Sequence, residues 1–396
     1  MAVNMISRSA AEALIEQQLI AAIQQDTPKT SIFQQLARRL PNMTSKQTRM
    51  RVLDVLPMAY WVDGDTGMKQ TSKQAWDNVY IDAAELAVIV PIPEAVVADA
   101  SIDIMGEVTP RILEAMGQCV DSAVLFGVNK PAIWRSDILT TARQAGNNVA
   151  PGATPNYYDL LLGEGGVISK VEASGRMVTA AIAAMGMRAK LRGIKGTDGH
   201  PIFNSDMQGA TQYALDGAPM HFPQNGAFDS NRAQLIVGDF SQAVWAIRQD
   251  VTVKILDQGV IQDPTTKEIV YNLAQQDMIA LRVVFRMGWA LPNPATRMDA
   301  DRTTCPFAYL EPATALTTQT VTFTVKDNAT TPNVIAGAIV DVNGARKKTN
   351  ASGVAAFTLE AGTYPVKVKK EGFGAVVDTV TVAAAAVSKD ITLTAG

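Results

Sequence analysis

The sequence changes character near Pro312, and this change constrains the fold more than any other feature. All of its 2 His, 2 Cys, 16 Met and 5 Trp residues precede this point in the 396-residue chain. The residues that follow are rich in Thr, Val, Ala and Lys, with Gly at the expected turns. We therefore expect a small all-β domain over residues 313–396, joined to a larger mixed domain.

The segment after residue 312 shows the alternation of a half-buried sheet. Val321, Phe323 and Val325 are predicted to face one side, while Lys367 and Lys369 alternate with valines and should be exposed. Asn-Gly at 343–344 is typical of a tight hairpin turn. The predicted exposed charges form either a solvated face, which we favour, or a surface that attracts anionic cell-surface material. They are Arg346, Lys347, Lys348, Lys367, Lys369 and Lys370.

Composition excludes some classes of function. The net charge is −3, and residues 313–396 hold eight Lys and Arg against six Asp and Glu, so neither part has the charge of a general nucleic-acid binder. Cys119 is expected to be a buried thiol in an apolar helix. With Cys305 it fits a reducing cytosol, a single disulfide being the alternative. No signal peptide or membrane span is recognisable.

The first 50 residues are predicted to contain short helices over residues 9–25 and 31–40. Residues 38–51 are basic. A solvated face is the favoured interpretation, and an arm that faces nucleic acid or an acidic neighbour is the functional one. The basic residues are Arg38, Arg39, Lys46, Arg49 and Arg51.

Residues 60–80 are predicted to form a two-stranded arm. Extended segments at 52–62 and 78–90 flank a turn cluster at 63–67 and a polar stretch. Lys69, Lys73 and Trp76 are the candidate contact residues of this arm.

The rest of the larger domain mixes helices and strands. A long helix is expected over 93–127, with Pro at its first turn, Gly127 after its end, and a kink or split at Gly106 and Pro110. Helices at 158–173 and 177–191 and strands at 196–203, 217–222, 234–239, 251–256 and 278–290 follow. Because no βαβ period appears, the predicted class is α+β.

Catalytic, cofactor and metal motifs are not recognisable in the sequence. No P-loop, dinucleotide fingerprint, C-x-x-C or H-E-x-x-H pattern is present. His200 and His221 are interpreted as structural, and the Asp-Gly cluster at 63–67 as a turn rather than a calcium loop. We expect no enzyme, no cofactor and no metal, but a structural or binding protein.

The order of segments resembles the major capsid proteins of tailed bacteriophages, with the Hong Kong 97-type fold, over residues of about 27–310. The resemblance rests on six short motifs: 92–95 (IPEA) with 123–127 (AVLFG), 190–192 (KLR), 198–203 (DGHPIF), 215–220 (LDGAPM), 237–241 (VGDFS) and 281–288 (LRVVFRMG). It implies an N-terminal arm (1–50) and a capsid domain (51–312). The latter would hold an extended loop (58–80), a spine helix (93–127) and an axial domain (177–290).

The resemblance also implies partners. Copies of the chain would form hexamers and pentamers of an icosahedral shell around double-stranded DNA, assembled in the bacterial cytoplasm, with a separate scaffolding protein, a portal and decoration proteins. Lys69 and Lys73 lie in the hairpin, but no acceptor Asn or activating Glu can be placed, so an inter-subunit cross-link is not expected.

Residues 313–396 resemble Ig-like or carboxypeptidase-regulatory-type sandwiches, which hold about seven strands. We expect this domain to fold alone, to lie outside the shell, to be dispensable for assembly, and to offer a surface for host glycans. A secreted or cell-surface adhesin with a carbohydrate-binding tail, or a hydrolase with an accessory sandwich, is the alternative. The size of the assembly separates these, because only the capsid protein forms a megadalton shell.

Overall fold

The computed structural model describes residues 30–62, 68–99, 104–152, 155–196, 198, 200, 202–203, 213–263, 266–312, 318–383 and 385–395. Among these, residues 89–113 and 254–282 belong to one compact unit, and the others to a second, larger unit. Strands β4 (Ala84–Pro93), β10 (Val244–Leu256) and β13 (Met278–Ala290) and helix α3 (Ile104–Phe126) each contribute to both units.

The smaller unit contains helix α2 (Glu94–Asp99) and an antiparallel pair, β11 (Val260–Gln262) with β12 (Ile269–Asn272). The backbone N–H of Glu94 donates to the carbonyl of Asp277 at 2.9 Å, just after β4 ends. The long helix expected over 93–127 is thus found as α2 and α3. Pro110 lies inside α3 and does not split it, and Gly127 ends the helix at φ +71°.

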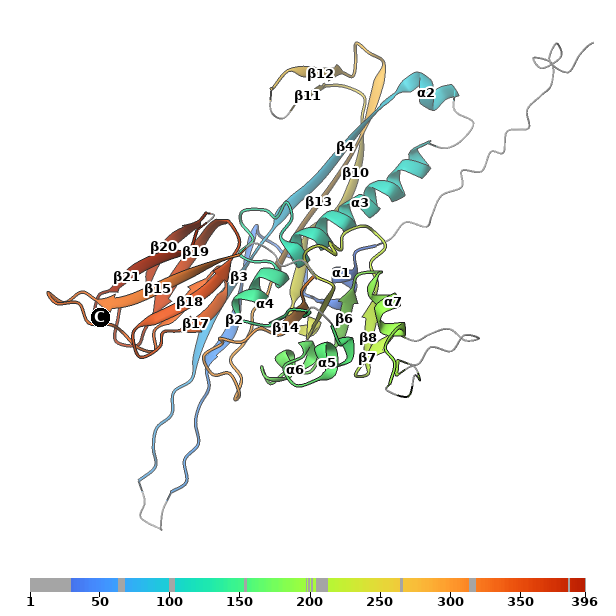
Figure 1. The fold of residues 1–396 in the computed structure, drawn as a ribbon. Helices are drawn as coiled ribbons and strands as arrows, with labels where there is room; N and C mark the ends of the chain where they lie inside the picture. The colour runs from blue at the N-terminus through green and yellow to red at the C-terminus, as the bar shows by residue number, and fades with distance from the viewer. Residues whose placement is uncertain are drawn as a thin grey trace, which may run out of the picture. The chain divides into compact units, whose positions relative to one another are not determined.

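A six-stranded sheet forms one core of the larger unit (Figure 1). Its order is β5 (Asn148–Val149), β14 (Phe307–Leu310), β9 (Leu235–Gly238), β6 (Ala180–Ala183), β8 (Ala218–His221) and β7 (Ala214–Leu215). Helices α5 (Tyr157–Leu162), α6 (Val167–Glu172) and α7 (Met187–Arg192) share its apolar cluster, which includes Leu161, Val171, Leu191, Val237 and Leu310.

Two helix predictions are wrong in this region. The helix expected at 177–191 is β6 followed by α7, because all four residues of β6 are buried and an all-buried strand lacks polar alternation. The helix expected at 158–173 is interrupted between α5 and α6. A side chain at Gly163 would meet the carbonyl of Asp159 at 2.6 Å, and Gly165 has φ +74°.

A second sheet has the order β1 (Arg38–Arg39), β10, β13 and β4. The bounds of β13 equal those of the predicted strand, whereas β10 begins earlier than expected. Helix α1 (Ile32–Leu36), helix α4 (Ile138–Gln144) and the short 3-10 helix η2 (Phe240–Gln242) lie in the connections of the larger unit. The buried carboxylate of Asp121 accepts hydrogen bonds from Ser31, Ile32 and Phe33 and so ties the start of α1 to α3.

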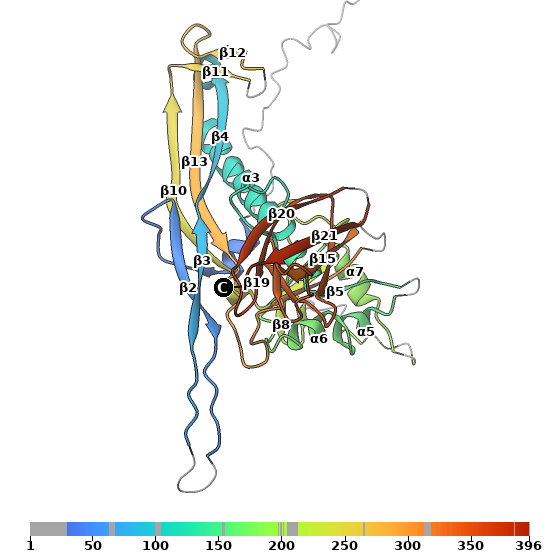
Figure 2. The same ribbon diagram turned by 90° about the vertical axis from the view of Figure 1, so that its left-hand side faces the viewer.

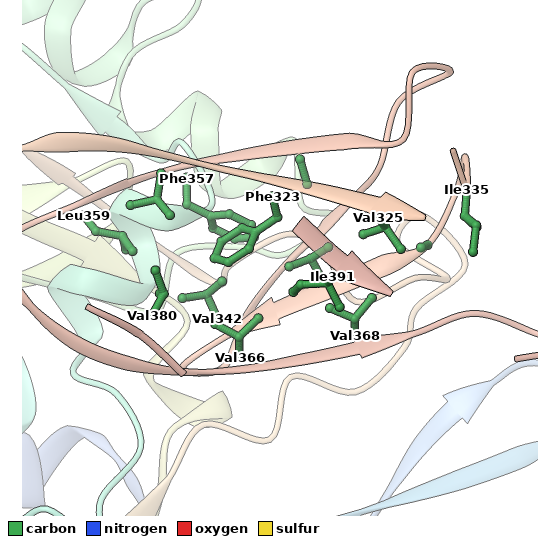
Figure 3. Close-up of a cluster of buried hydrophobic side chains, with 14 of the residues drawn as sticks. Phe323, Val325, Ile335, Val342, Phe357, Leu359, Val366, Val368, Val380 and Ile391 are labelled. Atoms are coloured by element: carbon green, nitrogen blue, oxygen red, sulfur yellow. The ribbon is translucent and has the colours of Figure 1, made fainter. Parts of the chain in front are cut away.

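Residues 319–393 form a sandwich of seven strands, as predicted for an all-β tail. One sheet is β18 (Val354–Leu359), β15 (Gln319–Asp327) and β21 (Val387–Leu393), and the other is β17 (Ala345–Lys348), β16 (Ile339–Val342), β19 (Gly362–Lys369) and β20 (Val376–Val382). Figure 3 shows Phe323, Phe357, Val342 and Val366 pointing into the space between the sheets. Asn343 and Gly344 both have positive φ, 51° and 101°, as the predicted Asn-Gly hairpin turn requires.

Candidate functional site: the hairpin and the docked C-terminal sandwich

Strands β2 (Gln47–Val55) and β3 (Ala75–Asp82) form an antiparallel hairpin whose two strands run side by side in both views (Figures 1 and 2). The prediction places a two-stranded arm at 60–80; the paired strands are instead 47–55, which lies before that range, and 75–82, which overlaps its end. The turn expected at 63–67 lies outside the described residues. On either side of it, Met58, Trp61 and Met68 are 61%, 103% and 93% exposed. Apolar side chains exposed to this degree are typical of a contact surface.

The other predicted site residues are spread along the N-terminal segment and the hairpin. Arg38 and Arg39 are exposed on β1, with the Arg39 guanidinium 5.6 Å from the ring centre of Trp245. Lys46, just before β2, and Arg49 and Arg51, on one face of β2, are exposed as well. Lys69 and Trp76 are also exposed, and Lys73 lies 3.6 Å from Glu371 of the sandwich. The five basic residues of the N-terminal segment therefore come from β1, from β2 and from the stretch between these two strands.

Two carboxylates at the base of the hairpin share one buried arginine. Asp77 is on β3, and Asp54 occupies the bulge of β2, where the register shifts between Leu53 and Val55. A bulge re-aims a side chain, and here both carboxylates lie 3.1 Å from Nη1 of Arg302. The other nitrogens of Arg302 donate to the carbonyls of Asn293 and Pro292. Both strands are thereby bound to the segment that precedes β14.

The C-terminal sandwich completes this cluster. Arg346 on β17 lies 3.2 Å from Asp77 and 3.1 Å from Asp341, and Lys369 on β19 lies 3.1 Å from Asp54. Burial raises the pKa of Asp54 and Asp77, but hydrogen bonds and nearby cations outweigh it, and both pKa values lie below the ordinary one. The lowering comes from Lys369 and Arg302 at Asp54, and at Asp77 from the backbone N–H of Asn78 and then from Arg346. We name Asp54, Asp77, Arg302, Asp341, Arg346 and Lys369 the hairpin-base cluster.

A second contact joins the sandwich to the core with the opposite polarity. Glu360, between β18 and β19, accepts from Nη1 of Arg143 at 2.5 Å and from Nη2 of Arg232 at 2.9 Å. Nε of Arg143, on α4, also donates to the hydroxyl of Tyr309 at 2.8 Å. Burial raises the pKa of Glu360, yet the two guanidinium groups lower it further than burial raises it. We name Glu360, Arg143 and Arg232 the Glu360 cluster.

These contacts correct the prediction that six basic residues of the tail form a free surface. Arg346 and Lys369 bind hairpin carboxylates, and Lys348 forms an ion pair with Asp301. Lys347 donates to the carbonyl of Ala356 at 2.9 Å and lies over the ring of Phe357. The sequence carries no signal of this docking, since Asp77 and Arg346 are 269 residues apart.

A cavity of about 90 Å³ lies beside the hairpin-base cluster. It is lined from four parts of the chain, including Asp77, Trp134, Trp289, Arg302 and Arg346. Strands β17 and β18 also approach helix α4. The sandwich therefore meets the rest of the larger unit through ion pairs and around a cavity lined by polar and apolar residues.

Other residues singled out in the sequence have ordinary surroundings. Cys119 is exposed, contrary to the prediction of a buried thiol, because the buried face of α3 is formed by Ile112, Met116, Val120 and Val124. Cys305 is buried, which raises its pKa to about 12. Burial also lowers the pKa of His221.

Neither a metal cluster nor a membrane helix is seen in the described part of the chain. Within the residues that the structure describes, no three His, Cys, Asp or Glu side chains are placed to hold a metal ion. No helix in the same ranges is long and apolar enough to cross a membrane.

The chain is similar to known proteins over most of its length. The phage capsid family model matches residues 11–296, and the PEGA domain model matches residues 334–395. The solved structure titled Microbacterium phage Oxtober96 is 33% identical, covers 78% of this chain and 100% of its own, and has a TM-score of 0.69. The solved structure titled Mycobacterium phage Adephagia is 31% identical, covers 79% of this chain and 100% of its own, and also has a TM-score of 0.69. No curated protein matches the chain.

The mixed fold with an extended hairpin and a long helix, together with these matches, is that of a structural protein of the Hong Kong 97 type. The chain belongs to the phage capsid family. It is a major capsid protein of a tailed phage, a virion component that assembles with copies of itself and carries an additional C-terminal β-domain.

Proposed function

We propose that this chain tiles an icosahedral shell as hexamers and pentamers and that its hairpin lies over a neighbouring subunit. The exposure of Trp61 and Met68 carries the proposal, because each places a large apolar side chain almost wholly in water on the single subunit. Burial against a neighbour removes that cost. The same proposal divides the chain into an N-terminal arm (1–50), a capsid domain (51–312) and a surface domain (313–396). It places assembly in the host cytoplasm, with separate scaffolding, portal and decoration proteins as partners.

Double-stranded DNA is the proposed content of the shell. Exposed Arg38, Arg39, Lys46, Arg49 and Arg51 would neutralise phosphates without reading bases. Because the whole chain has a net charge of −3, we expect weak attraction that falls steeply with added salt. Replacement of Arg49 and Arg51 with Gln should weaken binding equally for all DNA sequences. Sequence-selective binding would contradict this proposal.

The sandwich is proposed to lie on the outer face, where it does not compete with packaged DNA for space. Host-surface glycans are a proposed partner class, with Lys367 as the basic residue that remains exposed on β19. Electron microscopy of negatively stained, purified full-length protein tests the function. Closed shells that an antibody against the sandwich labels from outside would support it. Single subunits at micromolar concentration, or shells that the antibody does not label, would contradict it.

A further inference from the structure

The sandwich supplies the missing charges at two separate places in the same subunit. At the hairpin base it brings Arg346 and Lys369 to two carboxylates, and in the Glu360 cluster it brings a carboxylate to two arginines. We propose that the C-terminal sandwich is a fixed part of the assembling subunit that holds the base of the β2–β3 hairpin. This replaces the expectation from sequence that the domain is dispensable.

The hairpin-base cluster is electrically balanced only with the sandwich in place. Asp54, Asp77 and Asp341 face Arg302, Arg346 and Lys369, three charges of each sign. With the sandwich docked, the Arg302 side chain is 4% exposed and the Asp54 and Asp77 side chains are 21% and 31% exposed, so these charges are compensated mainly by one another and only in part by water. Without the sandwich, the two carboxylates would share Arg302 alone.

The Glu360 cluster fixes the orientation of the sandwich. Without Glu360, the guanidinium groups of Arg143 and Arg232 would lose their shared carboxylate, and the Arg143 side chain is 4% exposed. The two clusters require opposite charges from the sandwich, so a rotated domain would bring like charges together. Opposite polarity at two points therefore selects one docked arrangement.

The hairpin-base cluster includes a carboxylate from each strand of the hairpin. Asp54 is on β2 and Asp77 is on β3, and the two strands pair antiparallel between them. Cations on two strands of one sheet, β17 and β19, which lie on either side of β16, contact the two carboxylates. The direction in which the hairpin leaves its base is thus set by the sandwich. Its consequence for assembly rests on the proposed contact of the hairpin with a neighbouring subunit.

Amide hydrogen exchange on dissociated, full-length subunits tests this role. The variant Arg346→Met/Lys369→Met removes the two cations and leaves the apolar stems. We expect exchange in β2 and β3 to become about tenfold faster or more, with the six-stranded sheet unchanged. Lys367→Met, on the exposed side of the same strand, is the matched control and should change nothing.

Unchanged exchange in β2 and β3 of Arg346→Met/Lys369→Met would overturn the inference. If the double variant also speeds exchange in the six-stranded sheet, exchange in the variant Glu360→Gln is the deciding measurement, because Glu360 contacts neither hairpin strand. This variant should still speed exchange at the hairpin base, and an unaffected hairpin would refute the role. Exchange is measured before assembly, so this result does not depend on whether hairpins contact neighbours.

Discussion

Arg143, in the last turn of α4, and Glu360, between β18 and β19, form an ion pair of 2.5 Å across 217 residues of sequence. The hydroxyl of Tyr364 donates to the backbone carbonyl of Glu360 at 3.1 Å and steadies the loop that presents the carboxylate. This pair joins a small β-domain to the sheet core of a capsid subunit. A surface module attached only by a linker would not have such a contact.

The first prediction concerns the ion pair of Glu360. Glu360→Gln keeps the shape but removes the charge that two arginines share, and we expect the free energy of unfolding to fall by roughly 1–3 kcal/mol. The lower part of this range is favoured because the Glu360 side chain is 31% exposed. Thermal unfolding of unassembled subunits measures the change. Glu371→Gln is the control, because its 91% exposed side chain should contribute almost nothing.

The second prediction concerns acid. The pKa values of Asp54, Asp77 and Glu360 are lowered in the folded chain. A carboxylate with a lowered pKa contributes stability that is complete above its ordinary pKa of about 4 and is lost as the pH falls through the lowered value. Docking should therefore be constant near neutral pH and weaken below about pH 4.

Amide exchange of β17 and β18 as a function of pH, corrected for the intrinsic rate, measures this loss of docking. Strand β15 inside the sandwich is the internal reference. The pKa shift of Asp121 has the opposite sign, because burial raises it. Protonation of Asp121 therefore cannot cause a loss of stability in acid. Docking that weakens instead between about pH 5 and 8 would show that other groups control it.

The third prediction concerns the ends of the hairpin. Trp61→Ala/Met68→Ala should leave the unfolding temperature of the single subunit unchanged, because both side chains are exposed. The subunit concentration needed for assembly should rise about tenfold or more, since a buried large apolar side chain contributes about 1.5–3 kcal/mol. Light scattering during assembly measures this concentration. Val377→Ala, at a 74% exposed position of the sandwich, should assemble normally.

The fourth prediction concerns close packing in the six-stranded sheet. A side chain at Gly238 on β9 would lie 2.5 Å from the carbonyl of Pro306 and would also overlap the ring of Phe307. Gly238→Ala should therefore lower the free energy of unfolding by about 1–3 kcal/mol or more and reduce the soluble yield. Gly186→Ala is the matched control, since nothing lies within 4 Å and its φ of −62° suits alanine. Equal unfolding temperatures for the two variants would refute this explanation.

Local patterns allowed much of the fold to be predicted. The Asn-Gly turn at 343–344, the alternation at Val321, Phe323 and Val325, and the strand at 278–290 each follow from rules that act over a few residues. The pattern predicts helix for the buried strand Ala180–Ala183, because burial on both faces leaves no alternation and alanine favours helices.

The two charge clusters could not be predicted from the sequence. Asp54 and Asp77 lie between polar and apolar residues of a half-exposed hairpin, and their cationic partners are between 225 and 315 residues away. An isolated Asp or Lys in a strand is normally interpreted as a solvated charge. Only the folded chain shows that Lys369 binds Asp54 while Lys367, two residues earlier, stays exposed.

The most direct test of the docked sandwich is an averaged electron-microscopy density map of shells assembled from the full-length chain. The account predicts density for the sandwich that is as sharp as that of the six-stranded sheet, with Glu360 beside Arg143 and Arg346 beside Asp77. Diffuse density that leaves the sandwich without a fixed position, while the six-stranded sheet is sharp, would contradict the account.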